Sequence, residues 1–116
     1  MAQGRGSGED QGEPPIRYVI PIVKSPQYER DMVQIWDHIA QHNPDAADRV
    51  VMAVESMIEL LGEFPGIGTP CPHLAPGLRR TLWREYLIYY RINENRVEIV
   101  RALHGRRNFT PDQFHD

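Results

Sequence analysis

The sequence predicts an α+β domain in which a strand and a helical hairpin precede a three-stranded antiparallel meander, with both helices packed on one sheet face. Residues 26–64 repeat apolar side chains at helical spacing in two runs, and each run begins with a capping residue and a proline. Residues 78–103 instead form three short runs rich in β-branched and aromatic side chains, separated by charged or Asn-containing turns.

The chain of 116 residues suffices for one compact domain, which we expect to span residues 16–109. Residues 1–15 are rich in Gly, Pro and charge, which predicts a disordered leader. Residues 110–116 are expected to form a short acidic tail, with Pro111 placed to begin one more helical turn. The polar N-terminus, the lack of a long apolar run and the single cysteine, Cys71, predict a cytoplasmic protein without membrane contact.

The first predicted strand is the β-branched run at residues 16–24, which contains Pro21. Proline has no amide hydrogen to donate to a neighbouring strand. We therefore expect this strand to lie at a sheet edge, to be bulged, or to pair only around Pro21.

Two helices should follow, one over residues 26–41 and one over residues 44–64. Ser25 and Asn43 are favourable N-caps, each followed by a proline at the first helical position. Pro65 ends the second helix, and the short connection makes the pair an antiparallel hairpin. The stripes that should face the sheet comprise Tyr28, Met32, Ile35, Trp36 and Ile39, then Ala47, Val50, Val51, Val54, Met57, Ile58 and Leu61.

A Pro- and Gly-rich loop at residues 65–76 leads into the meander. Its strands are predicted at residues 78–83, 86–92 and 97–103. With the helices on one face of this sheet, the other face should be partly open.

Charge is segregated along the chain. Residues 77–109 carry eight arginines against three acids, whereas residues 16–76 carry eight acids against three arginines and one lysine. A basic sheet beside an acidic helical half suits an anionic partner. The guanidinium fork matches carboxylates and phosphates equally well, so an acidic protein and a nucleic acid both remain open as partners.

Strand alternation separates Arg79 from Arg80, so one of the two should point toward the helical side or its rim. Arg91 should lie on the face opposite Tyr90. Arg101 interrupts what reads as one apolar row, and if buried it needs a carboxylate partner on the helices. The row comprises Val97, Ile99 and Leu103.

No motif completes a metal, cofactor or nucleophilic site. His38 and His42 are four residues apart on a predicted helix, but no third ligand follows at useful spacing. Cys71 has no base beside it in the sequence, and the Gly-rich phosphate loops and serine-hydrolase elbows are absent. We therefore predict no catalytic residue, no metal and no cofactor.

The chain resembles the ParE branch of the RelE/ParE toxins of bacterial type II toxin–antitoxin systems over about residues 17–108. The resemblance lies in the meander segments YLIYYR (86–91), VEIVR (97–101) and LHGRR (103–107), and in IWDHIA (35–40) followed by NPDAA (43–47). Phe64-Pro65, Gly68 and residues 77–79 match the loop and the sheet entry. The departures are the leader, Pro21, and Asn108 where an Asp often follows the paired arginines.

The resemblance implies the RelE/ParE-like fold and a toxin that inhibits DNA gyrase by trapping its cleaved-DNA state. It also implies neutralisation by a small acidic ParD-like antitoxin and a role in plasmid maintenance or stress response. We expect its surface for target and antitoxin to comprise Arg79, Arg80, Arg91, His104, Arg106 and Arg107.

Two alternatives stay open. RelE-like relatives are ribosome-dependent mRNA endonucleases, and Arg80, Arg91 and His104 are the residues that such chemistry would use here. Against this, the chain is acidic overall, has one lysine, Lys24, and has no Tyr after the last predicted strand. The other alternative is a degenerate, non-toxic member that only binds an antitoxin.

Overall fold

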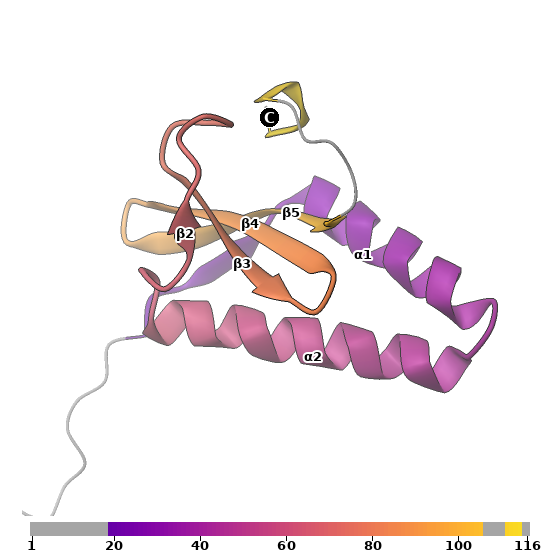
Figure 1. Cartoon of the computed structure of the whole chain (residues 1–116). Coiled ribbons are helices and arrows are strands. Elements are labelled where there is room, and N and C mark those ends of the chain that lie inside the picture. The colour runs from indigo at the N-terminus through magenta and orange to yellow at the C-terminus, as the bar shows by residue number, and fades with distance from the viewer. Residues whose placement is uncertain (1–18, 106–110, 115–116) are drawn as a thin grey trace, which may run out of the picture.

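The computed structural model describes residues 19–105 and 111–114 and has the predicted α+β architecture. A five-stranded sheet with the order β1-β5-β4-β3-β2 carries the helical hairpin on one face (Figure 1). The helices are α1 (Pro26–Ala40) and α2 (Pro44–Glu63). The strands are β1 (Ile22–Lys24), β2 (Thr69–Pro70), β3 (Leu78–Trp83), β4 (Tyr86–Asn93) and β5 (Arg96–His104), and a 3-10 turn, η1, spans Pro111–Phe114.

The first strand lies at a sheet edge, as its proline predicts, but it is shorter than expected. β1 pairs in parallel with β5, with Ile22 opposite Val97. Pro21 takes part only through its carbonyl oxygen, which accepts a hydrogen bond from the Val97 amide at 2.8 Å. Residues 19–21 are not strand, and residues 16–18 lie outside the described part of the chain.

Both helix starts are confirmed. The Ser25 side chain accepts a hydrogen bond from the Tyr28 amide at 2.9 Å, and the Asn43 side chain accepts one from the Ala46 amide at 3.1 Å. Each cap satisfies an amide that the first helical turn leaves without a partner. The antiparallel hairpin extends past the sheet at its turn, so part of its length has no strand beneath it (Figure 1).

The meander of β3, β4 and β5 is antiparallel throughout. Its two turns contain non-glycine residues in the left-handed region, namely Arg84 (φ 53°) in the first and Glu94 (φ 50°) and Asn95 (φ 63°) in the second. The two-residue strand β2 lies inside the predicted loop and pairs antiparallel with Arg79 and Arg80. Its composition, with a proline, gave no strand signal.

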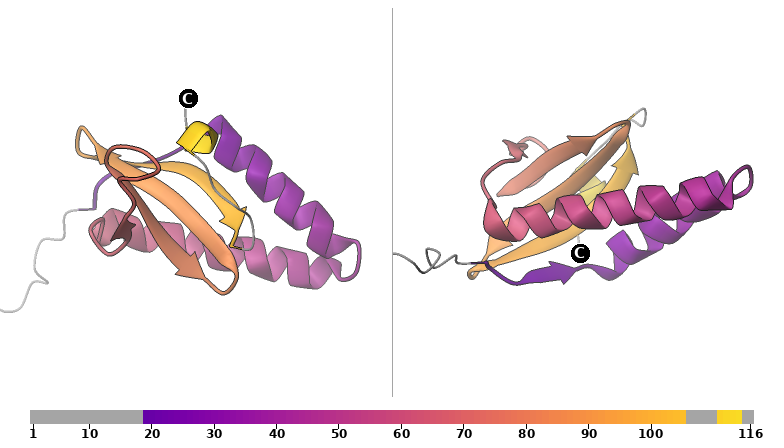
Figure 2. Two further views of the ribbon diagram at one scale, coloured as in Figure 1. Left: turned by 45° about the horizontal axis from the view of Figure 1, so that its top comes forward. Right: turned by 90° about the horizontal axis from the view of Figure 1, so that it is seen from below.

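The main core lies between the hairpin and the sheet (Figure 2). Its buried members come from both helices and from β4 and β5: Tyr28, Met32, Val54, Ile58, Leu61, Ile88, Tyr90, Val97, Ile99 and Ala102. This arrangement confirms that the helices cover one face of the sheet.

A second cluster covers much of the opposite face. The loop before β3 and the turn η1 supply Cys71, Leu74, Ala75 and Phe114, which pack on Leu78, Leu87, Tyr89, Val100 and Leu103. The Phe114 ring lies 4.6 Å, centroid to centroid, from that of Tyr89. The end of the chain that we assigned to a tail thus supplies a core side chain.

The predicted single row of Val97, Ile99, Arg101 and Leu103 is wrong, because a β-bulge interrupts β5. Tyr89 pairs with Arg101 and its neighbour Tyr90 pairs with Ile99, so Val100 is an extra residue on that strand. A bulge shifts the alternation of the side chains that follow it. Val97 and Ile99 therefore face the helices, whereas Leu103 belongs to the second cluster.

Candidate functional site

The sheet divides the expected functional residues between its two faces. Directly opposed residues of neighbouring antiparallel strands share a face. His104 is opposite Tyr86, on the face that carries the helices. Arg80 is opposite Tyr89, and Arg91 is opposite Leu78, both on the face of the second cluster.

Arg79 lies on the helical side and anchors the loop before β2. Its guanidinium donates hydrogen bonds to the carbonyl oxygens of Gly66 at 3.1 Å and Gly68 at 2.6 Å. The expectation that one of the paired arginines reaches this rim is confirmed. Because its guanidinium already binds two carbonyls, Arg79 contributes to the structure of the loop as well as to surface charge.

Arg91 lies near the far end of β4 and forms an ion pair with Glu98 of β5, with Nε 3.4 Å from Oε1. The two residues are directly opposite one another in the sheet. A partly exposed pair of this kind contributes little to stability, but it reduces the charge that Arg91 presents to a partner.

Arg80 is exposed and borders a hollow of about 470 Å³, which we call the Arg80 hollow. Its lining comprises Ile67, Thr69, Arg80, Thr81, Leu82, Leu87 and Gly105. The Leu82 side chain is 61% exposed and Ile67 is 56% exposed, so the cation stands beside accessible apolar surface. Gly105 directly precedes Arg106 and Arg107, which lie outside the described residues.

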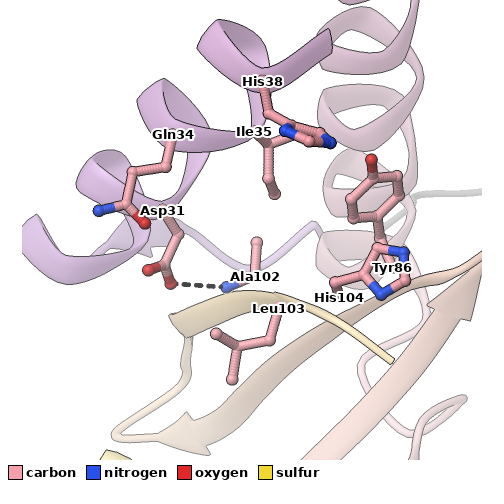
Figure 3. A pocket seen from close by; sticks show the side chains of 8 residues that line it. All are labelled: Asp31, Gln34, Ile35, His38, Tyr86, Ala102, Leu103 and His104. Carbon is pink, nitrogen blue, oxygen red and sulfur yellow. Dashed lines mark hydrogen bonds between the residues drawn. The ribbon is translucent and has the colours of Figure 1, made fainter. Parts of the chain in front are cut away.

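A second hollow of about 400 Å³, which we call the His38 pocket, lies between α1 and the adjoining ends of β4 and β5 (Figure 3). His38 and Ile35 point toward Tyr86 and His104 across it. The full lining is Asp31, Gln34, Ile35, His38, Tyr86, Ala102, Leu103 and His104. The His104 ring packs edge-on against Tyr86, with centroids 5.5 Å apart.

Sequence reasoning missed this pocket, since it considered His38 only as one of a possible pair of metal ligands with His42. A signal did exist, because Asp31, Gln34 and His38 recur at helical spacing beside the apolar stripe of α1. What the spacing could not reveal is that the end of β5 lies against that polar stripe.

Asp31 is the carboxylate partner that a buried Arg101 was expected to require. Its side chain is 3% exposed, and it binds the Arg101 guanidinium through both oxygens at 3.0 and 2.7 Å. Such bidentate geometry is the strongest form of this ion pair.

The pKa values are raised for Tyr86, which lines the His38 pocket, and for the buried Tyr89, which pairs with Arg80 in the sheet. Burial raises the pKa of the Tyr89 hydroxyl, and a hydrogen bond with Arg80 opposes the shift. Burial also raises the pKa of Tyr86, with a smaller contribution from the negative charge of Glu85. Both hydroxyls therefore keep their protons at physiological pH, and that of Tyr86 is the one that lines a hollow.

Within residues 19–105 and 111–114, no three His, Cys, Asp or Glu side chains are grouped so as to hold a metal ion. No helix in those ranges has the length and apolar character needed to cross a membrane. The Arg80 hollow offers a cation beside apolar surface, and the His38 pocket offers polar side chains beside apolar surface. The first of these suits contact with an acidic, partly apolar partner.

Comparison with known proteins points to one family. Residues 22–109 match the family model described as the ParE toxin of the type II toxin–antitoxin system parDE. Toxin ParE1 of Caulobacter vibrioides is 32% identical over 89 residues, which cover 76% of this chain and 92% of that protein. Toxin ParE1 of Mycobacterium tuberculosis is 27% identical over 84 residues, which cover 71% and 86%.

Solved structures show the same fold. A chain of the chromosomal ParDE system from P. aeruginosa superposes with a TM-score of 0.65 at 21% identity, covering 75% of this chain and 97% of that one. A chain of the RelBE2 toxin–antitoxin complex from Mycobacterium tuberculosis has a TM-score of 0.55 at 21% identity, covering 74% and 98%.

Proposed function

This chain belongs to the ParE toxin family of type II toxin–antitoxin systems, and from that membership we propose that it inhibits DNA gyrase and is held inactive by a ParD-like antitoxin. Gyrase inhibition requires a binding surface, whereas RNA cleavage requires acid, base and cation around a single phosphate. The observation that supports the binding role is the separation of Arg80, Arg91 and His104 by the sheet.

That separation is large as well as two-sided. His104 pairs with Tyr86 and Arg91 lies five residues further along the same strand, which is roughly 17 Å at about 3.3 Å per residue. Arg91 is also engaged by Glu98. These three residues are therefore poorly placed to act together on one scissile phosphate, which counts against the RelE-like alternative.

We propose that Arg80, with Arg106 and Arg107 that follow Gly105, makes the main contact with the target. The Arg80 hollow is continuous with the exit of β5 through Gly105. Arg79, Arg91 and His104 remain in the proposed contact surface with smaller contributions, because the guanidinium groups of Arg79 and Arg91 already bind carbonyl or carboxylate oxygens.

The antitoxin is proposed to compete for the same surface with an acidic and partly apolar segment. Leu82 and Ile67 are exposed beside Arg80 and can pack against apolar side chains of the antitoxin, while the Arg80 guanidinium pairs with one of its carboxylates. Such a segment gains its order on binding. Action in the cytoplasm, and a role in plasmid maintenance or stress response, follow from the same proposal.

The test compares purified wild-type protein, Arg80→Ala and Arg30→Ala in gyrase supercoiling and in ribosome-dependent mRNA cleavage. We expect the wild type to inhibit supercoiling without cleaving mRNA. Arg80→Ala should raise the half-inhibitory concentration about tenfold or more, as loss of a charge-assisted contact would do. Arg30→Ala removes an exposed cation of α1, distant from the hollow in the sequence, and should leave inhibition unchanged.

Cleavage of mRNA with intact supercoiling would overturn the gyrase proposal in favour of the RelE-like alternative. Activity in neither assay would favour the non-toxic alternative. The antitoxin proposal would be supported by an adjacent reading frame whose small acidic product co-purifies with this chain. If that product no longer co-purifies with the Arg80→Glu variant, its contact includes the Arg80 hollow.

A further inference from the structure

The outer edge of β5 loses its strand partner halfway along. β1 pairs only with Val97 to Ile99, and the chain then turns away into α1. Ser25 makes the last contacts of that segment, because its amide donates to the Ile99 carbonyl at 3.0 Å and its hydroxyl donates to the Val100 carbonyl at 2.8 Å. From Arg101 onward, no strand among the described residues lies beside this edge to supply carbonyl acceptors for its amides.

Asp31 of α1 takes the place of the missing strand. One carboxylate oxygen accepts hydrogen bonds from the Ala102 amide and from Arg101 Nε, both at 3.0 Å. The other accepts from Arg101 Nη2 at 2.7 Å and from Gln27 Nε2 at 3.1 Å. Four donors thus converge on a single buried carboxylate, and of the residues that the structure describes it is the only charged one classed as buried.

The contact falls where β5 most needs support. The bulge at Val100 interrupts the ladder to β4 immediately before Arg101, and bulged positions have weaker and more twisted pairing. Beyond Ala102, His104 lines the His38 pocket and Gly105 lines the Arg80 hollow. The Gly105 amide in turn donates to the Glu85 carbonyl at 2.6 Å. The strand end that serves both hollows is therefore held by Asp31 on one side and by Glu85 on the other.

We propose that Asp31 is a positioning residue, which fixes the end of β5 and so sets where His104 and Gly105 are presented at the two hollows. Its side chain is 3% exposed and its carboxylate oxygens already accept four hydrogen bonds, so this role requires no contact with the target. It acts through the Ala102 amide and the Arg101 guanidinium. The activity readout of this inference rests on the proposed function, whereas its structural readout does not.

The decisive variant is Asp31→Asn, which keeps the size of the side chain and one carbonyl acceptor but removes the charge that Arg101 binds. We compare the ratio of amide exchange rates between the variant and the wild type at two sets of residues. This ratio should be at least ten times larger at Ala102, Leu103 and Gly105 than at Val54 and Ile58. We also expect the half-inhibitory concentration in the gyrase supercoiling assay to rise at least tenfold, measured on protein that is folded at the assay temperature.

The matched control is Ile58→Val, which loosens the main core without removing any of the hydrogen bonds that hold the end of β5. It should lower the melting temperature and leave inhibition by the folded protein unchanged. If Asp31→Asn does not fold, Arg101→Lys replaces it, because lysine keeps the positive charge, leaves the bond from Ala102 to Asp31 in place and removes the bidentate fork. This variant should show a smaller increase in both exchange and half-inhibitory concentration.

An equal increase of the amide exchange rate across the whole sheet in Asp31→Asn would overturn the positioning role. Faster exchange confined to the end of β5, with unchanged inhibition of gyrase, would also overturn it. If the wild type itself does not inhibit gyrase, the proposed function fails. The exchange measurement then still decides whether Asp31 holds the end of the strand.

Discussion

At the scale of single residues, the Tyr90 hydroxyl links the sheet to the loop before β2. It accepts a hydrogen bond from the Gly68 amide at 2.7 Å and donates one to the Pro65 carbonyl at 2.8 Å, and the side chain is fully buried. Burial raises the pKa of Tyr90 despite the opposing bond from Gly68, so the hydroxyl stays neutral and can play both roles.

Tyr90→Phe should lower the free energy of unfolding by about 1–3 kcal/mol, because the Gly68 amide and the Pro65 carbonyl are left without this partner. Urea denaturation measures the change. Tyr86→Phe is the control on the same strand, since the Tyr86 side chain borders the open His38 pocket where water can replace a lost contact. Equal losses in the two variants would argue against a special role for Tyr90.

The sequence predicted some of these residue-level contacts and not others. That Arg101 needs a carboxylate from the helices follows from the cost of burying an unpaired charge. Which carboxylate it binds did not follow, because the bulge at Val100 changes the face on which Arg101 emerges. Strand alternation correctly put Arg79 and Arg80 on opposite faces and Arg91 on the face opposite Tyr90, since the pairing of β3 with β4 is regular.

At the scale of elements, the loop before β2 packs too closely on the sheet to admit a side chain at Gly68. A Cβ atom there would lie 2.4 Å from the Tyr90 hydroxyl and 2.8 Å from the Arg80 carbonyl oxygen. The second contact is with backbone, which cannot move aside without disturbing the pairing of β2 with β3.

Gly68→Ala should therefore lower the free energy of unfolding by about 1–3 kcal/mol, the usual cost of overpacking. Gly66→Ala is a matched control in the same loop, because a Cβ atom at Gly66 would meet nothing within 4 Å. Thermal unfolding of both variants measures the difference. A Gly68→Ala protein as stable as Gly66→Ala would contradict the close packing described here.

Glu55 of α2 joins three elements, since it accepts hydrogen bonds from Lys24 of β1 and from the Tyr28 hydroxyl of α1, the latter at 2.7 Å. Burial alone would raise the pKa of Glu55, but these two bonds lower it below its ordinary value of 4.5. A carboxyl with a lowered folded-state pKa adds stability that is present above the unfolded-state pKa. That contribution is lost as the pH falls through the folded-state pKa.

The stability gap between the wild type and Glu55→Gln should accordingly narrow as the pH falls from about 6 to about 3. Melting temperatures across this range measure the gap. Glu59→Gln, an exposed carboxyl change on the same helix, controls for general charge effects. A gap that is constant with pH would show that the ionised form of Glu55 adds nothing to stability.

The elements that the sequence predicted well are those defined by local patterns. The caps at Ser25 and Asn43 and the alternating runs of the meander are written into neighbouring residues. β2, the bulge and the shortened β1 depend instead on what each segment lies beside in the folded chain. The His38 pocket was missed for the same reason, because it joins α1 to strands that follow it by about fifty residues or more in the sequence.

At the scale of the whole molecule, the sheet separates two hollows, and each of them borders the end of β5. The Arg80 hollow lies on one side and includes Gly105, while the His38 pocket lies on the other and includes His104. The excess of arginine in the meander is thereby spread over two faces rather than gathered around one phosphate. This distribution suits recognition of an extended partner.

The measurement that tests the central claim most directly is the yield of cleaved plasmid. Plasmid, gyrase, ATP and purified toxin are mixed, and the gyrase is then denatured to release any cleaved DNA. We predict that linear DNA bound covalently to gyrase accumulates with the wild-type protein, and that about tenfold more of the Arg80→Ala protein is needed for the same yield. Unchanged supercoiling and no linear DNA, at protein concentrations well above those of gyrase, would contradict the account.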